Sequence, residues 1–164
     1  MQPICHLSTR VRGFTLVELL VVLAMLGVLS AALLPLSETW VRAQQERQLR
    51  QALWEIRNAI DTYKKVADQG AIGSVGPDTG YPPNLQALSL GTADARPASR
   101  GQALYFLRRL PRDPFADPAL PAEQTWRLRS YASPPNRPAP GADVFDIQSS
   151  SNETALDGSR YATW

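Results

Sequence analysis

The N-terminal part of the chain divides into a polar leader, a long apolar run and an amphipathic stretch. Residues 14–36 are almost entirely apolar, and the leader before them carries Arg10 and Arg12. A helix needs about 20 predominantly apolar residues to cross a bilayer, and positive charge beside such a helix keeps that flank in the cytoplasm. The pattern therefore predicts a transmembrane helix over residues 14–36, with its topology set by Arg10 and Arg12.

Apolar residues continue beyond this run at intervals of three or four, which is typical of a helix with one buried face. They are Trp40, Val41, Leu49, Leu53, Ile56, Ile60, Tyr63 and Val66. The polar face between them includes Arg42, Glu46, Arg50 and Arg57. We expect one long helix from about Phe14 to about Val66, with Pro35 as a site for a kink.

Downstream of the long helix, the pattern changes to loops and short elements. The glycine-rich residues 70–80 predict a loop. Asn84 is a candidate cap for a short helix, and residues 101–109 are a second helical candidate. Alternating side chains predict strands at residues 126–131 and 143–147. The expected fold class is α+β, with the long N-terminal helix packed on a small antiparallel sheet.

Glu18 is the one charged residue within the apolar run. A carboxylate at that depth costs roughly 2.5 to 3.5 kcal/mol on insertion scales, so a membrane helix that keeps one is expected to give it a partner. The alternative is that Glu18 reaches interfacial water near the cytoplasmic face and has no role. The surrounding residues favour a partner.

The junction of leader and apolar run reads Gly13-Phe14-Thr15-Leu16-Val17-Glu18. It resembles the processing site of type IV pilins and type II secretion pseudopilins. The resemblance implies that a prepilin peptidase removes residues 1–13 by cutting after Gly13, and that the new amino group of Phe14 is methylated. It also implies that Glu18 pairs with the amino group of Phe14 in a neighbouring copy, which sets the register of a filament.

Further segments resemble the major, G-type pseudopilins in particular. They are Tyr81-Pro82, Leu110-Pro111-Arg112-Asp113-Pro114, Asp143-Val144-Phe145 and the closing Trp164. This resemblance implies a structural subunit of a periplasmic pseudopilus in type II protein secretion. It implies single-pass anchoring in the bacterial inner membrane, self-association, and contact with other pseudopilins and an inner-membrane assembly platform.

Length, charge and residue content narrow the remaining function classes. Residues 37–164 are enough for one periplasmic domain. The chain has 17 basic and 15 acidic residues, and loss of Arg10 and Arg12 leaves 15 of each, so no nucleic-acid surface is indicated. Cys5 and His6 are the only cysteine and histidine, and both lie in the leader. The processed chain is therefore expected not to be an enzyme of the Ser-His-Asp or Cys-His kind.

Two groups of acidic residues are candidate sites. G-type pseudopilins bind calcium near their C-terminal strands, and this chain offers oxygen ligands there: Asp146, Ser149, Ser150, Ser151, Asn152, Glu153 and Asp157. The match to the family loop is poor, so we assign no metal ligands, and a solvated turn with a bend at Asp157-Gly158 is the alternative. Asp113 and Asp117 each precede a proline, which favours turn formation over acid-base catalysis.

Two other functions and one other targeting signal remain open. A minor pilin of a type IV pilus uses the same processing signal. A monomeric, membrane-anchored periplasmic binding module would use the loop at residues 70–80 as its ligand contact. A secretory signal cleaved near residues 30–32 fits less well, because secretory apolar cores span about 7 to 15 residues and this run is longer and carries an acid.

Overall fold

A computed structural model describes residues 13–73 and 78–164, without the side chains of residues 31–37. The chain divides into two compact units, residues 1–41 and residues 42–164. Residues 1–12 of the predicted leader, with Arg10 and Arg12, lie outside the described residues.

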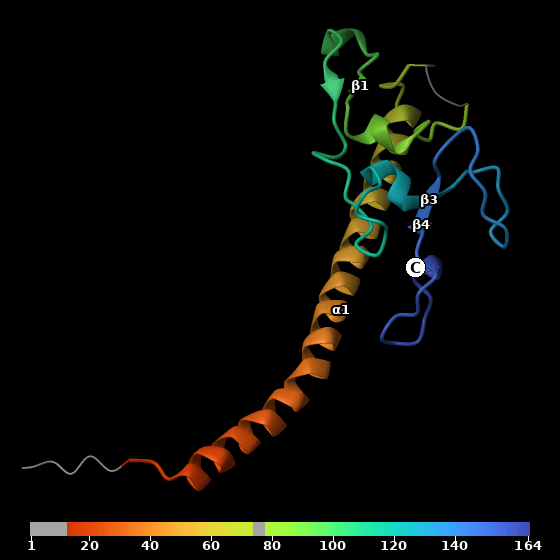
Figure 1. The fold of residues 1–164 in the computed structure, drawn as a ribbon. Coiled ribbons are helices and arrows are strands. Elements are labelled where there is room, and N and C mark those ends of the chain that lie inside the picture. The colour runs from red at the N-terminus through yellow and green to blue at the C-terminus, as the bar shows by residue number, and fades with distance from the viewer. Residues whose placement is uncertain (1–12, 74–77) are drawn as a thin grey trace, which may run out of the picture. The chain divides into compact units, whose positions relative to one another are not determined.

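The longest element is α1, Leu16–Asp68, which confirms the predicted long helix (Figure 1). Thr15 precedes its first turn, and the first backbone bond runs from the Leu19 N–H to the Thr15 carbonyl at 3.1 Å. Gly70 follows its last turn with φ +73°, a left-handed conformation that a glycine adopts without strain. In the part of the chain with described side chains, no helix meets the length and hydropathy required of a membrane span.

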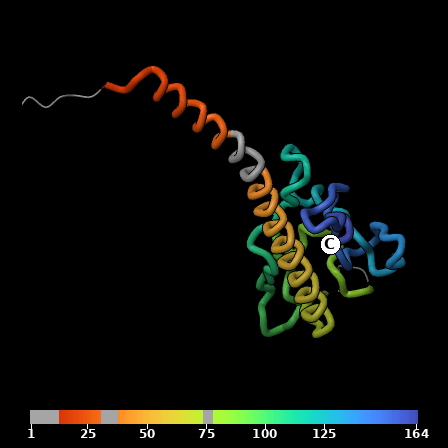
Figure 2. Tube along the Cα trace, turned by 90° about the horizontal axis from the view of Figure 1, so that it is seen from below, coloured from red at the N-terminus to blue at the C-terminus, as the bar shows by residue number. Residues whose placement is uncertain are grey.

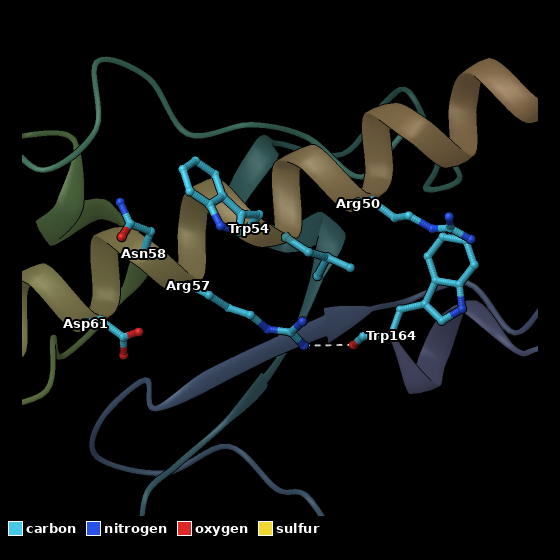
Figure 3. A pocket seen from close by; sticks show the side chains of 7 residues that line it. Arg50, Trp54, Arg57, Asn58, Asp61 and Trp164 are labelled. Atoms are coloured by element: carbon cyan, nitrogen blue, oxygen red, sulfur yellow. Dashed lines mark hydrogen bonds between the residues drawn. The ribbon is translucent and has the colours of Figure 1, made fainter.

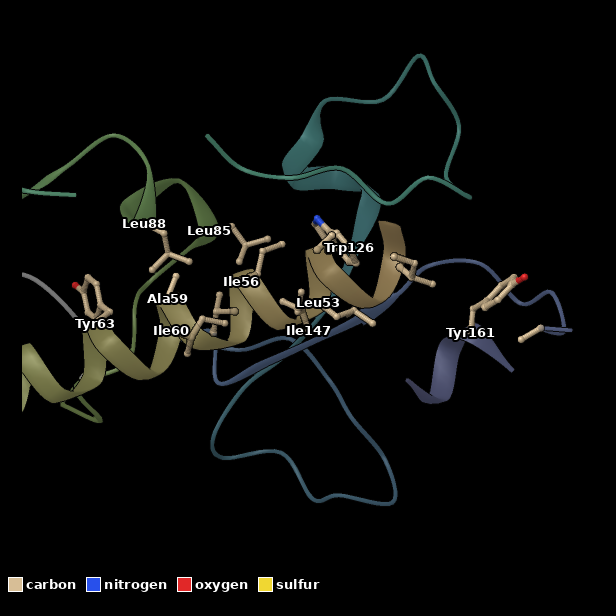
Figure 4. Close-up of a cluster of buried hydrophobic side chains, with 14 residues drawn as sticks. Leu53, Ile56, Ala59, Ile60, Tyr63, Leu85, Leu88, Trp126, Ile147 and Tyr161 are labelled. Carbon is tan, nitrogen blue, oxygen red and sulfur yellow. The ribbon is translucent and has the colours of Figure 1, made fainter. Parts of the chain in front are cut away.

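The core of the second unit is built on one face of α1. Leu49, Leu53, Ile56, Ile60 and Tyr63 are all buried on this face. They belong to one cluster with buried residues from the rest of the unit, namely Leu85, Leu88, Trp126, Ile147 and Tyr161, which Figure 4 labels. Val144 is part of the same cluster. The predicted three-to-four periodicity is confirmed from Leu49 to Tyr63, whereas Trp40 and Val41, predicted on the same face, are exposed.

Four short elements follow α1 between residues 85 and 104. Asn84 caps the 3-10 helix η1, Leu85–Leu88, by accepting from the Ala87 N–H at 2.9 Å, as predicted. Strands β1, Thr92–Ala93, and β2, Ala103–Leu104, pair antiparallel on either side of the 3-10 helix η2, Pro97–Ser99.

The predicted helix at residues 101–109 is wrong. Ala103 and Leu104 form β2, and the N–H groups of Phe106 and Leu107 both donate to the Leu88 carbonyl. Arg100 and Gly101 have φ of 52° and 78°, which a right-handed helix cannot contain. Pairing with segments earlier in the chain overrides the local helical propensity.

A second antiparallel pair lies near the C-terminus. β3, Trp126–Arg129, follows the 3-10 helix η3, Ala122–Thr125, and pairs with β4, Asp146–Ser149. The strand predicted at residues 126–131 is confirmed for residues 126–129 and ends two residues earlier than predicted. The strand predicted at 143–147 begins three residues later than predicted. Asp143 and Val144 instead bond to loops, because the Asp143 carboxylate binds the Thr79 and Ser130 hydroxyls and the Val144 N–H donates to Pro82.

The architecture is α+β, with one long N-terminal helix and two small antiparallel sheets, which is consistent with a pilin-like fold. In Figure 2, the segment that contains β1 and β2 and the C-terminal segment flank the second half of α1. The chain closes with the 3-10 helix η4, Tyr161–Thr163.

Candidate functional site

Gly13 and Phe14, the predicted processing residues, lie exposed just before α1. Phe14 is 80% exposed. A Cβ added to Gly13 would meet no atom within 4 Å, and its backbone does not have the positive φ that favours glycine. Neither local packing nor backbone conformation therefore requires a glycine at this position.

Thr15 precedes α1, and Glu18 lies in its first turn. The Glu18 N–H donates to the Thr15 hydroxyl at 3.2 Å, which satisfies one of the free N–H groups of the first turn. The carboxylate of Glu18 belongs to that first turn, where the helix dipole stabilises negative charge. Sequence reasoning did not assign this role to Thr15, although Thr15-x-x-Glu18 is the pattern of a capping box.

The first turns of α1 expose apolar side chains on every side. All residues from 13 to 30 are exposed. The large apolar ones are Phe14, Leu16, Val17, Leu19, Leu20, Val21, Val22, Leu23, Met25, Leu26, Val28 and Leu29. A helix that is apolar all round needs a cover of lipid or protein, because water does not stabilise such a surface.

The comparison with protein families falls on this same segment. Residues 8–34 match the prokaryotic N-terminal methylation motif. This match supports the interpretation that the chain is a type IV pilin-like protein that prepilin peptidase processes. The matched residues include Gly13, Phe14 and Glu18, together with Arg10 and Arg12 of the leader. Neither the curated proteins nor the solved structures gave a match to the chain.

The acidic residues considered for calcium do not converge on one point. Asp146 bonds Arg57 at 2.8 Å, Glu153 bonds Arg42 at 3.1 Å, and Asp157 lies 3.4 Å from Arg50. Among the described residues, no group of three or more acidic, histidine or cysteine side chains is placed to hold a metal ion.

Ser149 and Ser151 of the same segment also have protein partners. Ser149 is buried and donates its hydroxyl to Asp113 at 2.6 Å. The Ser151 hydroxyl accepts from the Glu153 N–H. Gly158 has φ +86°, in agreement with the predicted bend at Asp157-Gly158. The donor set described here therefore does not fit a calcium ion, which needs six to eight converging oxygens.

Asp113 and Asp117 shape turns, as the following prolines predict. The Asp113 carboxylate accepts from the Phe115 N–H at 2.8 Å, and the Asp117 carboxylate accepts from the Ala119 N–H at 2.9 Å. Asp113 is also buried, at 1% exposed. Each carboxylate is thus used by its own turn.

Asp143 is a buried carboxylate, which the sequence predicted only as the start of a strand. It accepts three hydrogen bonds, from the hydroxyls of Thr79 and Ser130 and from the Tyr131 N–H, at 2.6, 2.7 and 2.9 Å. Burial raises the pKa of Asp143, but these hydrogen bonds outweigh it and hold the pKa below its ordinary value. Asp143 closes the proline-rich loop between β3 and β4.

The tryptophans divide between core and surface. Trp126 is buried and its indole N–H donates to the Pro111 carbonyl at 3.0 Å. Trp40 and Trp54 are 65% and 67% exposed on α1. Trp164 lies between these cases, since its ring packs edge-on against Tyr161.

Proposed function

We propose that this protein is a structural subunit of a periplasmic pseudopilus that takes part in type II protein secretion. The observation that carries the proposal is the methylation motif over residues 8–34, which includes the first turns of α1, where residues 16–29 expose apolar side chains on all sides. The subunit works by packing and not by catalysis.

Processing is the first step of the proposed function. Prepilin peptidase cuts after Gly13, and the amino group of Phe14 is then methylated. The exposed position of Gly13, and the absence of a local structural need for glycine there, support a requirement imposed by the peptidase. A residue without a side chain allows an extended backbone to lie close to the enzyme.

Membrane insertion is the second step. Residues 14–36 supply the apolar length for one bilayer crossing. The leader arginines Arg10 and Arg12 keep the N-terminus in the cytoplasm, so the domain of residues 37–164 lies in the periplasm.

Assembly is the third step. Copies leave the bilayer through an assembly platform and cover each other's apolar helices in the fibre, together with other pseudopilins. Glu18 of one copy pairs with the amino group of Phe14 in the next, and this pair fixes the axial register. Each charge offsets the desolvation cost of the other.

A fibre assay with Glu18→Gln tests the assembly step. The chain is co-expressed with prepilin peptidase and the assembly platform, and sheared fibres are collected by centrifugation. We expect Glu18→Gln to be processed but to give few fibres, whereas Glu38→Gln, an exposed acid beyond the apolar run, assembles normally. Normal fibres from Glu18→Gln would contradict the role in register.

The second candidate function is that of a minor pilin in a type IV pilus, which the methylation motif supports equally. Deletion in the host separates the two machines. Loss of exoprotein secretion with intact pili fits the pseudopilus, whereas loss of surface pili, motility or DNA uptake with normal secretion fits the pilus. If the protein is a monomeric anchored module, its deletion should cause neither loss, and its function should not depend on Glu18.

A further inference from the structure

Four charged side chains form a stripe along α1 in the second unit. Arg42, Glu46, Arg50 and Arg57 are spaced by four, four and seven residues, which places them on one side of a helix. All four contact the segment from Asp146 to Trp164. We call these three arginines together with Glu46 the arginine latch.

Arg57 makes three hydrogen bonds to the segment. Its guanidinium donates to the Asp146 carboxylate at 2.8 Å, to the Ile147 carbonyl at 2.9 Å and to the Trp164 main-chain oxygen at 2.7 Å. Figure 3 shows Arg57 extending from α1 to Trp164. One side chain therefore joins β4 and the last residue of the segment to the helix.

Arg42 holds the middle of the segment. It donates to the Glu153 carboxylate at 3.1 Å, to the Thr154 carbonyl at 2.7 Å and to the Tyr161 hydroxyl at 3.3 Å. An arginine fork satisfies a carbonyl and a carboxylate at once, which a lysine cannot do with the same geometry.

Glu46 is the buried member, at 7% exposed. Its carboxylate accepts from the Leu156 N–H at 2.7 Å and from the Tyr161 hydroxyl at 2.9 Å. Tyr161 in turn stacks on Phe115, with the ring centroids 4.1 Å apart. Glu46 thus joins Leu156 and Tyr161 to α1, and Tyr161 is itself part of the core.

Arg50 is the most exposed member. It lies 3.4 Å from the Asp157 carboxylate, and its guanidinium carbon is 4.3 Å from the centre of the Trp164 ring. Both partners of the Arg50–Asp157 pair are more than half exposed, so solvent screens their attraction.

We propose that the arginine latch, and not a bound divalent cation, keeps the segment from Asp146 to Trp164 closed on α1. The carboxylates of Asp146, Glu153 and Asp157 that a cation would need are each directed at a different arginine. A calcium ion at these carboxylates would compete with the three arginines for them. The inference concerns one folded copy and holds whether or not the chain forms a fibre.

Hydrogen exchange of the full-length chain in detergent micelles tests this proposal in two arms. In the first arm, the unsubstituted chain is compared after treatment with EDTA and in excess calcium. We expect the same protection of amides 146–164 in both. A gain of tenfold or more in protection with calcium, absent with magnesium, would overturn the proposal.

The second arm compares Arg57→Ala with Arg47→Ala, an exposed arginine on the same helix. We expect exchange of amides 146–149 and 161–164 to rise on the order of tenfold in Arg57→Ala, as for the loss of a charged hydrogen bond. We expect little change in Arg47→Ala, and little change at the remote β1 and β2 in either variant. Equal exchange in the two variants would overturn the proposal.

Arg42→Ala provides a second variant, since Arg57→Ala removes three contacts and can destabilise the whole unit. Its effect should centre on amides 153–161, where Arg42 makes its contacts. Exchange in Arg42→Ala that matches Arg47→Ala would contradict the latch, even where Arg57→Ala fails to fold.

Discussion

The N–H of Glu18 donates a hydrogen bond to the hydroxyl of Thr15, 3.2 Å away, at the first turn of α1. This bond fixes where the helix begins relative to Gly13, the proposed cleavage position. Cleavage there leaves Phe14 as the first residue and Thr15 as the cap of the mature helix. The proposed assembly residue, Glu18, then lies within one turn of the new amino group.

Replacing Thr15 tests this cap. Thr15→Ala removes the acceptor for the Glu18 N–H and should weaken the first turn by about 1 kcal/mol, the usual cost of a lost N-cap. That cost corresponds to about fivefold faster exchange of the Glu18 amide, measured by NMR in micelles. Thr15→Ser keeps the hydroxyl and should exchange at the original rate; equally fast exchange in both variants would argue against the cap.

The buried face of α1 should dominate the stability of the second unit. Ile56 is fully buried, so Ile56→Ala should lower the free energy of unfolding by about 2–5 kcal/mol. The measurement is denaturant unfolding of the full chain in micelles, followed by near-UV circular dichroism. Trp54→Ala is the matched control, because Trp54 is exposed on the same helix and its loss should cost far less. Similar losses in the two variants would contradict the burial pattern.

The Tyr161 hydroxyl is the meeting point of Glu46 and Arg42. Tyr161→Phe removes both hydrogen bonds and leaves Glu46 with one partner fewer, which should cost about 1–3 kcal/mol of unfolding free energy. Tyr105→Phe, at an exposed tyrosine, serves as the control and should be close to neutral. A neutral Tyr161→Phe would show that water replaces these bonds without loss.

Asp143 predicts a pH dependence of stability. Its pKa in the folded chain lies below the ordinary value, because the hydrogen bonds from Thr79, Ser130 and Tyr131 outweigh the effect of burial. The folded state therefore gains stability from ionised Asp143 above the unfolded pKa of about 3.9, and loses it as the pH falls through the folded pKa. The difference in unfolding free energy between the chain and Asp143→Asn should be constant near neutral pH and shrink in acid. A difference that grows in acid would reverse the sign of the shift.

Patterns of local sequence predicted the helical part of the fold well. The apolar period from Leu49 to Tyr63 specified the buried face of α1, and Asn84 specified a cap three residues before its bonded N–H. The alternation in residues 126–131 specified β3. These features depend on neighbours within a few positions, which the sequence displays directly.

Contacts between distant residues were not predictable in the same way. Glu46 was placed on the polar face by its period, yet it is buried because residues 156 and 161 return to cover it. Residues 101–109 do not form a helix because β1 and Leu88 take their backbone groups. β4 begins later than predicted because Asp143 bonds to Thr79 and Ser130, which lie far from it in sequence.

Mass spectrometry of the N-terminus tests the proposed cleavage after Gly13 and methylation of Phe14 directly. The full-length chain is expressed with and without a prepilin peptidase, and the intact mass and the N-terminal peptide are determined. We expect a chain that starts at N-methylated Phe14 only when the peptidase is present. An uncut chain starting at Met1 in its presence, or a cut near residues 30–32, would contradict the proposed pilin-like processing.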